Sequence, residues 1–286
     1  MTTPETLGSI FGAVSAALLK AGFDEPRRRA RRLVAAALDV PMTDVFAHLD
    51  RLITEDDGER IGNVLRRVLA HEPLSRVLGV REFWGRDFAL SPETLDPRPE
   101  SEIVIEAVIA RRPERDRPCR ILDLGTGSGC LLLALLSEFQ AASGIGVDLA
   151  FGAAAAARRN AARLGLGDRA GFVVGDWTAA LASCFDVVVA NPPYIASTAI
   201  ACLPREVRDF DPHRALDGGS DGLDAYRAIS AGLPRLLASG GIFAGEIGQG
   251  QDRAVAGLIT ARGLAIDAII PDLAGIPRCV VARRAG

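Results

Sequence analysis

The 286-residue chain contains little lysine, histidine, tryptophan or tyrosine: Lys20 is the only lysine, and there are three His, two Trp and two Tyr. The histidines, His48, His71 and His213, lie far apart and form no HxxxH pair. The five cysteines form no CxxC pair. Because zinc sites use closely spaced His and Cys ligands, we expect no metal site.

Long apolar runs are also missing, so we expect no membrane-spanning segment. The first residues lack a charged start followed by a continuous apolar block, which argues against a signal peptide. The cysteines are expected to be reduced, mostly buried thiols of a cytoplasmic protein. A net charge of -3 and a pI near 5.7 disfavour a broad positive field for nucleic acid.

The first part of the chain, residues 1–75, has a wholly helical pattern and is expected to form a small separate domain. Asp24 is a candidate N-cap for the second helix, with Pro26 in its first turn. Five arginines between positions 27 and 32 surround the apolar face of that helix. A solvated surface is favoured for this run over a binding role, which stays open.

The remainder is expected to be α/β. In residues 76–95, apolar and polar residues alternate on both sides of Gly85, which predicts a β-hairpin that links two domains. Residues 96–286 then alternate between strands and helices, which predicts a mostly parallel sheet covered on both faces, with an antiparallel hairpin at its edge. Strands are expected near 120–124, 145–149, 171–175, 185–190 and 240–246, and helices near 101–111, 128–139, 150–164 and 222–238.

A glycine-rich turn, ILDLGTGSGC at residues 121–130, follows the first of these strands. Glycines there let the backbone approach a ligand at the carboxyl end of a parallel strand. The dinucleotide fingerprint needs glycine at position 130, where this chain has Cys130. The GxGxG spacing after an acid suits S-adenosylmethionine better than a pyrophosphate. The candidate donor-binding residues here are Asp123, Gly125, Thr126, Gly127, Ser128 and Gly129.

Two further acids lie at the ends of the next two strands: Asp148 ends the second strand, and Asp176 follows the third. Asp148 could accept both ribose hydroxyls, a feature that nucleotide binders share, or could be a helix N-cap. Asp176 could accept the exocyclic amine of an adenine while Trp177 packs on its ring, although an N-cap is an equal interpretation of Asp176.

The apolar run Val187–Ala190 ends in Asn191-Pro192-Pro193-Tyr194. The Asn191 side-chain oxygen and the Pro192 carbonyl provide two acceptors, which suit a planar –NH₂ group, and Tyr194 offers a face for packing. Binding both N–H groups would direct the nitrogen lone pair at a methyl group, which is catalysis by positioning and electrostatics. Asn191, Pro192 and Tyr194 are therefore the candidate catalytic residues, and the whole Asn191–Tyr194 turn is the candidate substrate site.

The set EFWGRDF, PRPESE, DLGTGSG, Asp148, DW and NPPYI resembles the peptide chain release factor glutamine methyltransferases over nearly the whole chain. NPPY alone is shared with many amino-methyltransferases, whereas EFWGRDF with PRPESE is far more specific. Two positions depart from the family pattern: Asp96 stands where an aliphatic residue is common, and Ser101 where threonine is common. The family's EIG run is matched by Glu246-Ile247-Gly248, whose role is open.

The resemblance implies a Rossmann-like class I methyltransferase domain behind a small helical domain that docks the substrate. It also implies methylation of the glutamine of the GGQ loop in release factors 1 and 2, with Gly125–Gly129, Asp148, Trp177 and Asn191 contacting S-adenosylmethionine. No metal, membrane or direct nucleic-acid contact is expected.

The same set of motifs also fits other functions. A ribosomal-protein glutamine methyltransferase would have the same amide pocket. A nucleic-acid adenine or guanine amino-methyltransferase would add a basic channel, for which the arginine run is the only support. A nucleotide binder of Rossmann type, either non-catalytic or redox, is disfavoured by Cys130 and by the NPPY turn.

Overall fold

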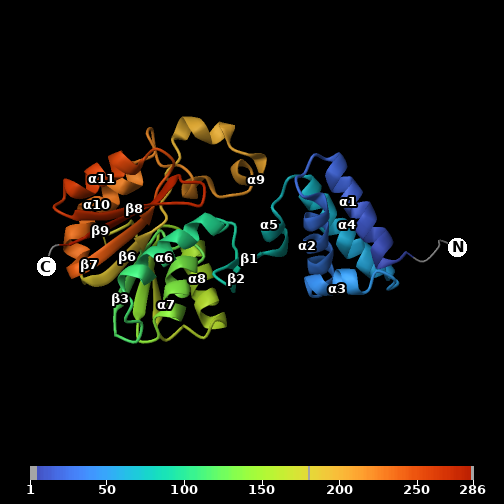
Figure 1. Cartoon of the computed structure of the whole chain (residues 1–286), viewed down its shortest axis with the longest axis horizontal. Helices are drawn as coiled ribbons and strands as arrows, with labels where there is room; N and C mark the ends of the chain where they lie inside the picture. The colour runs from blue at the N-terminus through green and yellow to red at the C-terminus, as the bar shows by residue number, and fades with distance from the viewer. Residues whose placement is uncertain (1–4, 180, 285–286) are drawn as a thin grey trace. The chain divides into compact units, whose positions relative to one another are not determined.

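The computed structural model describes residues 5–179 and 181–284. The chain divides into two compact units, Met1–Gly79 and Val80–Gly286 (Figure 1). The boundary falls directly before the hairpin strand β1 (Val80–Phe83). Each unit therefore has its own hydrophobic core, and each is described by itself.

The first unit is helical, as predicted. It contains α1 (Leu7–Lys20), α2 (Pro26–Leu38), α3 (Met42–Ala47), α4 (Glu55–Leu69) and α5 (Leu74–Leu78). Thr54 and Asp57 form a reciprocal capping box at the start of α4, which satisfies N–H groups that the helix itself cannot pair. The apolar faces of these helices meet in one cluster that includes Phe11, Leu33 and Ile61.

The start of α2 differs from the prediction. Its N-cap is Glu25 in a left-handed conformation with φ of 47°, without a side-chain cap, so the assignment of Asp24 was wrong. The Asp24 carbonyl instead accepts a hydrogen bond from Arg29 Nε. Pro26 does occupy the first turn. Its fixed φ suits that position, where the missing N–H has no helical partner.

The arginines of α2 are mostly exposed, as a solvated surface requires, and three of them also contact aromatic rings. The guanidinium groups of Arg27, Arg29 and Arg31 lie over the rings of Phe11, Phe23 and Phe46, at 5.9, 5.3 and 5.4 Å from the ring centroids. A cation over a ring face is attracted by the π-electron quadrupole. These arginines therefore cover aromatic side chains within the first unit.

The second unit is built on a seven-stranded sheet with the order β5-β4-β3-β6-β7-β9-β8. The strands are β3 (Arg120–Leu124), β4 (Ser143–Asp148), β5 (Ala170–Val174), β6 (Phe185–Ala190), β7 (Leu237–Glu246), β8 (Ala265–Pro271) and β9 (Pro277–Arg283). The pairs among β3 to β7 are parallel, whereas β9 runs antiparallel to both β7 and β8. The predicted parallel sheet with an antiparallel edge hairpin is confirmed.

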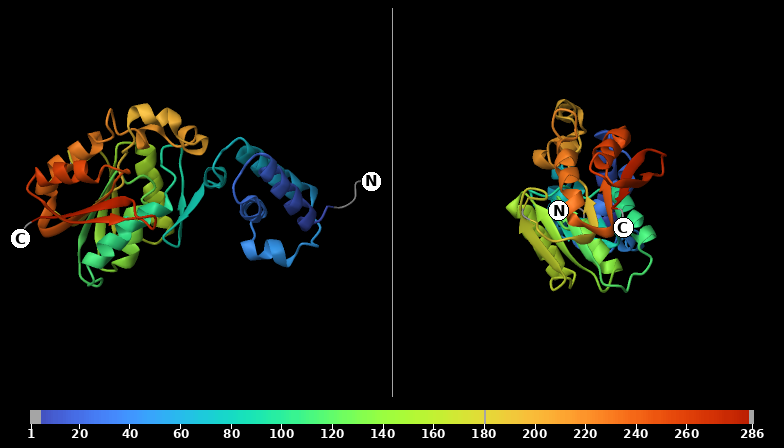
Figure 2. Two further views of the ribbon diagram at one scale, coloured as in Figure 1. Left: turned by 45° about the horizontal axis from the view of Figure 1, so that its top comes forward. Right: turned by 90° about the vertical axis from the view of Figure 1, so that its left-hand side faces the viewer.

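Helices cover both faces of this sheet (Figure 2). Alternate residues of the central strands point to opposite faces: Val187 and Val189 join one cluster, and Val188 joins the other. The first cluster contains α6 (Glu102–Arg111), α7 (Cys130–Glu138) and α8 (Phe151–Arg163). The second contains α10 (Asp224–Leu236) and α11 (Asp252–Thr260). Burial on both faces explains why these strands are apolar throughout.

Several short elements had no sequence prediction. They are η1 (Pro99–Ser101), η2 (Ser197–Cys202), α9 (Arg205–Arg208), η3 (His213–Ala215) and the longer helix α11. Except for η1 and α11, they lie in the long connection between β6 and α10. This connection continues from the NPPY turn, so it borders the carboxyl end of the sheet.

The hairpin of β1 and β2 (Arg86–Ala89) is part of the second unit. Its two-residue turn, Trp84 and Gly85, has φ of 52° and 66°, the positive values that match the twist of paired strands. Trp84 donates hydrogen bonds to Glu102 from its backbone and to Glu138 from its indole. Phe83 and Phe88 are fully buried against α6 and α7. The residues predicted as a linker therefore help to form a core.

The thiols are less buried than predicted. All five are free, but only Cys119 and Cys279 are buried, while Cys184 and Cys202 are exposed. Burial raises the pKa of the Cys279 thiol to about 12. Elsewhere, none of the helices in the described ranges combines the length and the apolar character needed to cross a bilayer.

Because Phe88 is fully buried, we expect Phe88→Ala to lower the free energy of unfolding of the second unit by about 3–5 kcal/mol, the usual range for a deleted core phenyl ring. Denaturant unfolding would measure this loss. Asp87→Ala, at the exposed neighbouring position, is the matched control. A Phe88→Ala protein as stable as the control would show that the hairpin does not belong to the core.

Candidate functional site

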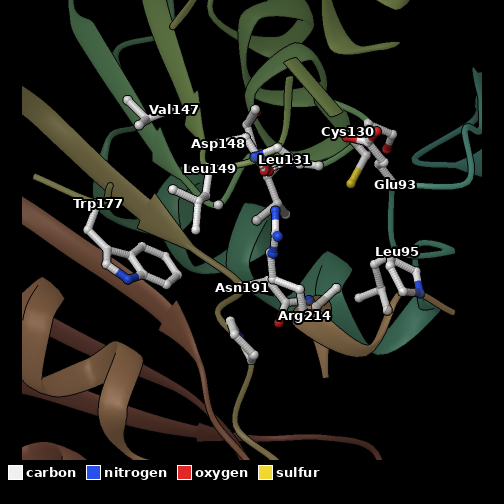
Figure 3. A pocket seen from close by; sticks show the side chains of 18 of the residues that line it. Glu93, Leu95, Cys130, Leu131, Val147, Asp148, Leu149, Trp177, Asn191 and Arg214 are labelled. Atoms are coloured by element: carbon white, nitrogen blue, oxygen red, sulfur yellow. Dashed lines mark hydrogen bonds between the residues drawn. The ribbon is translucent and has the colours of Figure 1, made fainter. Parts of the chain in front are cut away.

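The carboxyl ends of β3, β4, β5 and β6 meet at one edge of the sheet. The register aligns Leu124 with Val147 and with Ala190, so the loops after these strands start side by side. Strand order reverses between β3 and β6, where open α/β sheets bind their ligands. A cavity of about 650 Å³ lies here, and Figure 3 shows the side chains that surround it.

Gly125, Gly127 and Gly129 all have positive φ, at 75°, 55° and 83°. A Cβ on Gly125 would lie 3.3 Å from Trp177 Cζ3, and a Cβ on Gly129 would lie 3.1 Å from Ala157 Cβ. Gly125 therefore lets the indole close one side of the cavity. Gly129 lets α7 start close to α8.

Asp123 lies beneath this turn and is buried. Its Oδ2 accepts a hydrogen bond from Thr126 Oγ1 at 2.7 Å, while no well-aligned donor reaches Oδ1 from the described residues. Burial raises the pKa of Asp123 to about 7. The glycine turn is thus underlain by a carboxyl group that holds its proton far more readily than a solvated one.

Asp148, at the end of β4, faces the glycine turn. Its Oδ2 accepts from Gly127 N–H at 2.8 Å, and its Oδ1 accepts from Ala150 N–H at 2.9 Å. Helix α8 has Ala150, not Asp148, as its N-cap. Burial raises the Asp148 pKa, while the two N–H groups and the charge of Arg214 oppose that rise. This carboxylate is therefore preorganised at the cavity wall.

Asp176 and Trp177 both line the cavity. Residues 177–179 form a turn and not a helix, so Asp176 does not serve there as a helix N-cap. Trp177 has φ of 43°, a conformation that bulky residues rarely adopt. Such strain often accompanies functional sites, because the surrounding structure must hold it in place.

Asn191 directly follows β6, and its Nδ2 donates to Ser101 Oγ at 2.9 Å. Since the amide nitrogen is engaged in this bond, its Oδ1 is the group left to accept from a ligand. Ser101, the position that departs from the family pattern, is buried and lines the same cavity. A threonine would offer the same hydroxyl.

Tyr194 is held at both its side chain and its backbone. Its hydroxyl donates to Glu246 Oε1 at 3.0 Å, and its carbonyl accepts from Gln251 Nε2 at 2.9 Å. Burial is the main cause that raises the Tyr194 pKa well above its usual value, so the phenol stays neutral.

Most of the predicted site residues surround the cavity. Those that line it are Gly125, Thr126, Gly127, Ser128, Asp148, Asp176, Trp177, Asn191 and Pro193, whereas Asp123, Gly129, Pro192 and Tyr194 lie outside its lining. Asp123 and Gly129 support the glycine turn from beneath, and the contacts expected of Pro192 and Tyr194 stay predictions.

Sequence analysis missed other lining residues, chiefly Ser101, Glu93, Leu149 and Arg214. Figure 3 shows Trp177 and Leu149 on one side of the cavity and Glu93 and Leu95 on the other. Leu149 is adjacent to Asp148, so its position was available from sequence. Arg214 comes from η3, which no sequence pattern indicated.

A cluster of charges joins two borders of the cavity. Arg98 Nη2 pairs with Asp211 Oδ2 at 2.5 Å, and Asp96 lies 3.7 Å from both Arg81 and Arg98. Asp96 and Asp211 are buried. Asp96, where the resemblance implies an aliphatic residue, is thus matched by two arginines, and the cluster connects the PRPESE turn to the connection before η3.

The pKa of Asp123 is about 7 in the folded protein and 3.8 for the solvated group. Between these two pH values, the folded protein retains the Asp123 proton, whereas the unfolded chain has lost it. The contribution of Asp123 to stability is therefore complete below about pH 4 and is lost as pH rises to about 7.

We expect the difference in free energy of unfolding between wild type and Asp123→Asn to fall over this range by a few kcal/mol, since one pKa unit corresponds to about 1.4 kcal/mol. Denaturant titrations at several pH values would measure it, with exposed Asp168→Asn as control. A pH-independent difference would contradict the prediction.

Comparison with known proteins agrees with this architecture. Residues 11–79 match the family "PrmC N-terminal domain", and residues 115–249 match a "Methyltransferase domain" family. A solved methyltransferase from Pyrococcus furiosus has the same fold, with a TM-score of 0.53 at 16% identity, covering 79% of this chain and 100% of that one.

Two curated relatives are much more similar in sequence. The release factor glutamine methyltransferase of Rhodospirillum rubrum is 49% identical, over 97% of this chain and 85% of the relative. That of Bradyrhizobium diazoefficiens is 46% identical, over 99% and 96%. At this identity and coverage, the chain belongs to the release factor glutamine methyltransferase family.

Proposed function

We propose that this protein transfers a methyl group from S-adenosylmethionine to the side-chain amide nitrogen of the glutamine in the GGQ loop of peptide chain release factors 1 and 2. The observation that carries the proposal is the orientation of Asn191: its Nδ2 is bonded to Ser101, which leaves Oδ1 as an acceptor at the cavity. Membership of the family supports the choice of a release factor as substrate.

The cavity suits the donor. Its volume of about 650 Å³ falls within the usual range for ligand pockets, about 300–1,000 Å³. Asp148 would accept the ribose hydroxyls, and Asp176 with Trp177 would hold the adenine. The glycine turn, where a Cβ at position 125 would press on Trp177, provides the close backbone approach. S-adenosylmethionine, when bound, supplies an electrophilic methyl group.

The residues of the NPPY turn would bind and orient the glutamine. Asn191 Oδ1 and the Pro192 carbonyl would each accept one N–H of the side-chain amide. An amide nitrogen is a poor nucleophile because its lone pair is delocalised into the carbonyl group. Holding both N–H groups on fixed acceptors disfavours the planar geometry and exposes the lone pair, so the gain in rate comes from positioning and preorganised polar groups.

The rigidity of this turn supports the same role. Pro192 and Pro193 fix two successive φ angles, and Gln251 and Glu246 hold Tyr194 at its carbonyl and hydroxyl. Acceptors that are already in place need no rearrangement during the reaction. The helical part, residues 1–75, is proposed to dock the release factor, with residues 76–95 as the hairpin that leads to the transferase part, residues 96–286.

A transfer assay tests the acceptor. With methyl-labelled S-adenosylmethionine, we expect label on a purified release factor and none on the same factor whose GGQ glutamine is replaced by alanine. Peptide mass spectrometry would locate the added methyl group. Label on a ribosomal protein or an RNA in place of the release factor would refute the proposed acceptor while keeping the amino-group pocket.

A substitution tests the pocket. We expect Asn191→Ala to lower kcat by about 10²-fold or more, as loss of one fixed polar group at a reacting centre does, and to weaken donor binding much less. Kinetics and calorimetry would separate the two effects. Thr198→Ala, at an exposed position of the following connection, is the matched control. Near-normal turnover by Asn191→Ala would rule out its assigned role.

A further inference from the structure

One wall of the cavity is formed by η3 and the proline before it, residues 212–215, which we call the η3 wall. Leu95 and Pro97, which lie far away in the sequence, line the same cavity. Figure 3 shows Leu95 and Arg214 among the side chains that surround it. A donor in this cavity would therefore contact two segments that must be held together by tertiary contacts.

Asp211, the residue directly before the η3 wall, makes such a contact. Its side chain is buried, and both of its carboxylate oxygens accept hydrogen bonds from the other segment. Oδ1 accepts from the Asp96 N–H at 3.2 Å, and Oδ2 accepts from Arg98 Nη2 at 2.5 Å. These bonds join residues 115 and 113 positions apart. Because two atoms of one side chain are held, they fix both the position and the rotation of the carboxylate.

The opposite end of the η3 wall is held by backbone hydrogen bonds. Ile195 N–H donates to the Leu216 carbonyl at 3.1 Å, and Gly218 N–H donates to the Ile195 carbonyl at 2.8 Å. Ile195 directly follows the NPPY turn, so this end is attached to the candidate substrate site. The η3 wall is therefore held at both ends, and Asp211 provides the attachment to the segment that contains Leu95 and Pro97.

Stability alone does not explain why this carboxylate is buried. Desolvation of an ion pair costs free energy that the attraction between the charges roughly offsets, so a buried pair is weak evidence for stability. The same connection contains a contrasting cluster, in which exposed Asp209 pairs with Arg205 and Arg208. Exposed pairs of this kind contribute little. Asp209 is therefore a suitable comparison for Asp211.

We propose that Asp211 is a positioning residue for the methyl donor: by binding Asp96 and Arg98 at its two oxygens, it holds the η3 wall in place before the donor arrives. A wall that is already ordered spares the donor the entropy cost of ordering it, which raises affinity. Asp211 itself is not part of the cavity lining, so it acts through the wall. This inference rests on the proposed use of S-adenosylmethionine.

Asp211→Asn tests the attachment with almost no change of shape. An asparagine has one acceptor oxygen and one –NH₂ donor. Whichever way its amide turns, the –NH₂ meets either the Asp96 N–H or the Arg98 guanidinium group, so one bond is lost. We expect D211N to raise the donor Kd by about tenfold or more, and to change kcat at saturating donor by less than about threefold, the result of lost binding without lost transition-state stabilisation.

Calorimetry and steady-state kinetics would measure these two effects at a temperature at which every variant is folded. Asp209→Asn is the matched control, because it removes an exposed aspartate of the same connection, and we expect its donor Kd to stay at the wild-type value. A D211N protein that binds the donor as tightly as D209N overturns the proposal, even if its melting temperature is lower. A fall in kcat as large as the rise in Kd also overturns it.

Arg98 provides an independent arm. Its side chain is partly exposed, so R98Q removes the same contact without placing a new group at the buried position. We expect R98Q to raise the donor Kd as D211N does, and the double variant D211N/R98Q to be little worse than either single variant, because both act through one contact. Effects on Kd that multiply in the double variant would overturn the proposed attachment.

Hydrogen exchange separates this inference from the proposed function. The η3 wall contains its own backbone bonds, such as that from Ala215 N–H to the Pro212 carbonyl at 2.8 Å. In the donor-free protein, we expect residues 212–216 to exchange about tenfold faster in D211N than in D209N, because the lost attachment permits local opening. Unchanged exchange overturns the positioning role, whichever molecule is methylated. A wild-type protein that does not bind S-adenosylmethionine would instead refute the proposed donor.

Discussion

The alignment of parallel strand ends is the constraint on which the site depends. Five strands run in one direction, namely β3, β4, β5, β6 and β7. The residues that follow them therefore all lie at the same edge of the sheet. Four of these ends border the cavity, and the fifth supplies the carboxylate behind it. A strand shifted by one residue would move a side chain to the opposite face of the sheet, so burial of both faces keeps every polar group in register.

Much of this could be predicted from sequence. The apolar strands, the glycine turn and the acids at the ends of β4 and β5 were identified because each has a local sequence pattern. Burial of both sheet faces accounts for the apolar pattern of the strands. Ser101, Glu246 and Arg214 could not be assigned in the same way. Their contacts join residues more than fifty positions apart in the sequence, as in the Ser101–Asn191 and Tyr194–Glu246 hydrogen bonds. A local sequence pattern cannot reveal such pairs.

Tertiary context explains where the structure departs from the sequence predictions and where it adds to them. The arginine run of α2 was expected to form a solvated surface, and most of it is exposed, but three of its guanidinium groups also lie over phenyl rings of neighbouring segments. Asp24 has a good capping side chain, but the left-handed backbone at Glu25 moves the helix start by one residue. The hairpin was predicted as a linker between domains, and the structure adds that its two phenylalanines are completely enclosed.

The uneven exposure of the thiols has a practical consequence. Thiol reagents attack the accessible thiolate, and burial raises the pKa of Cys119, Cys130 and Cys279. Cys184 and Cys202 remain exposed, one just before β6 and the other in η2 beyond its far end. The native chain thus carries two dye-attachment points on either side of β6, the strand that Asn191 directly follows. Movement of the connection over the cavity could be followed by energy transfer without introducing a cysteine.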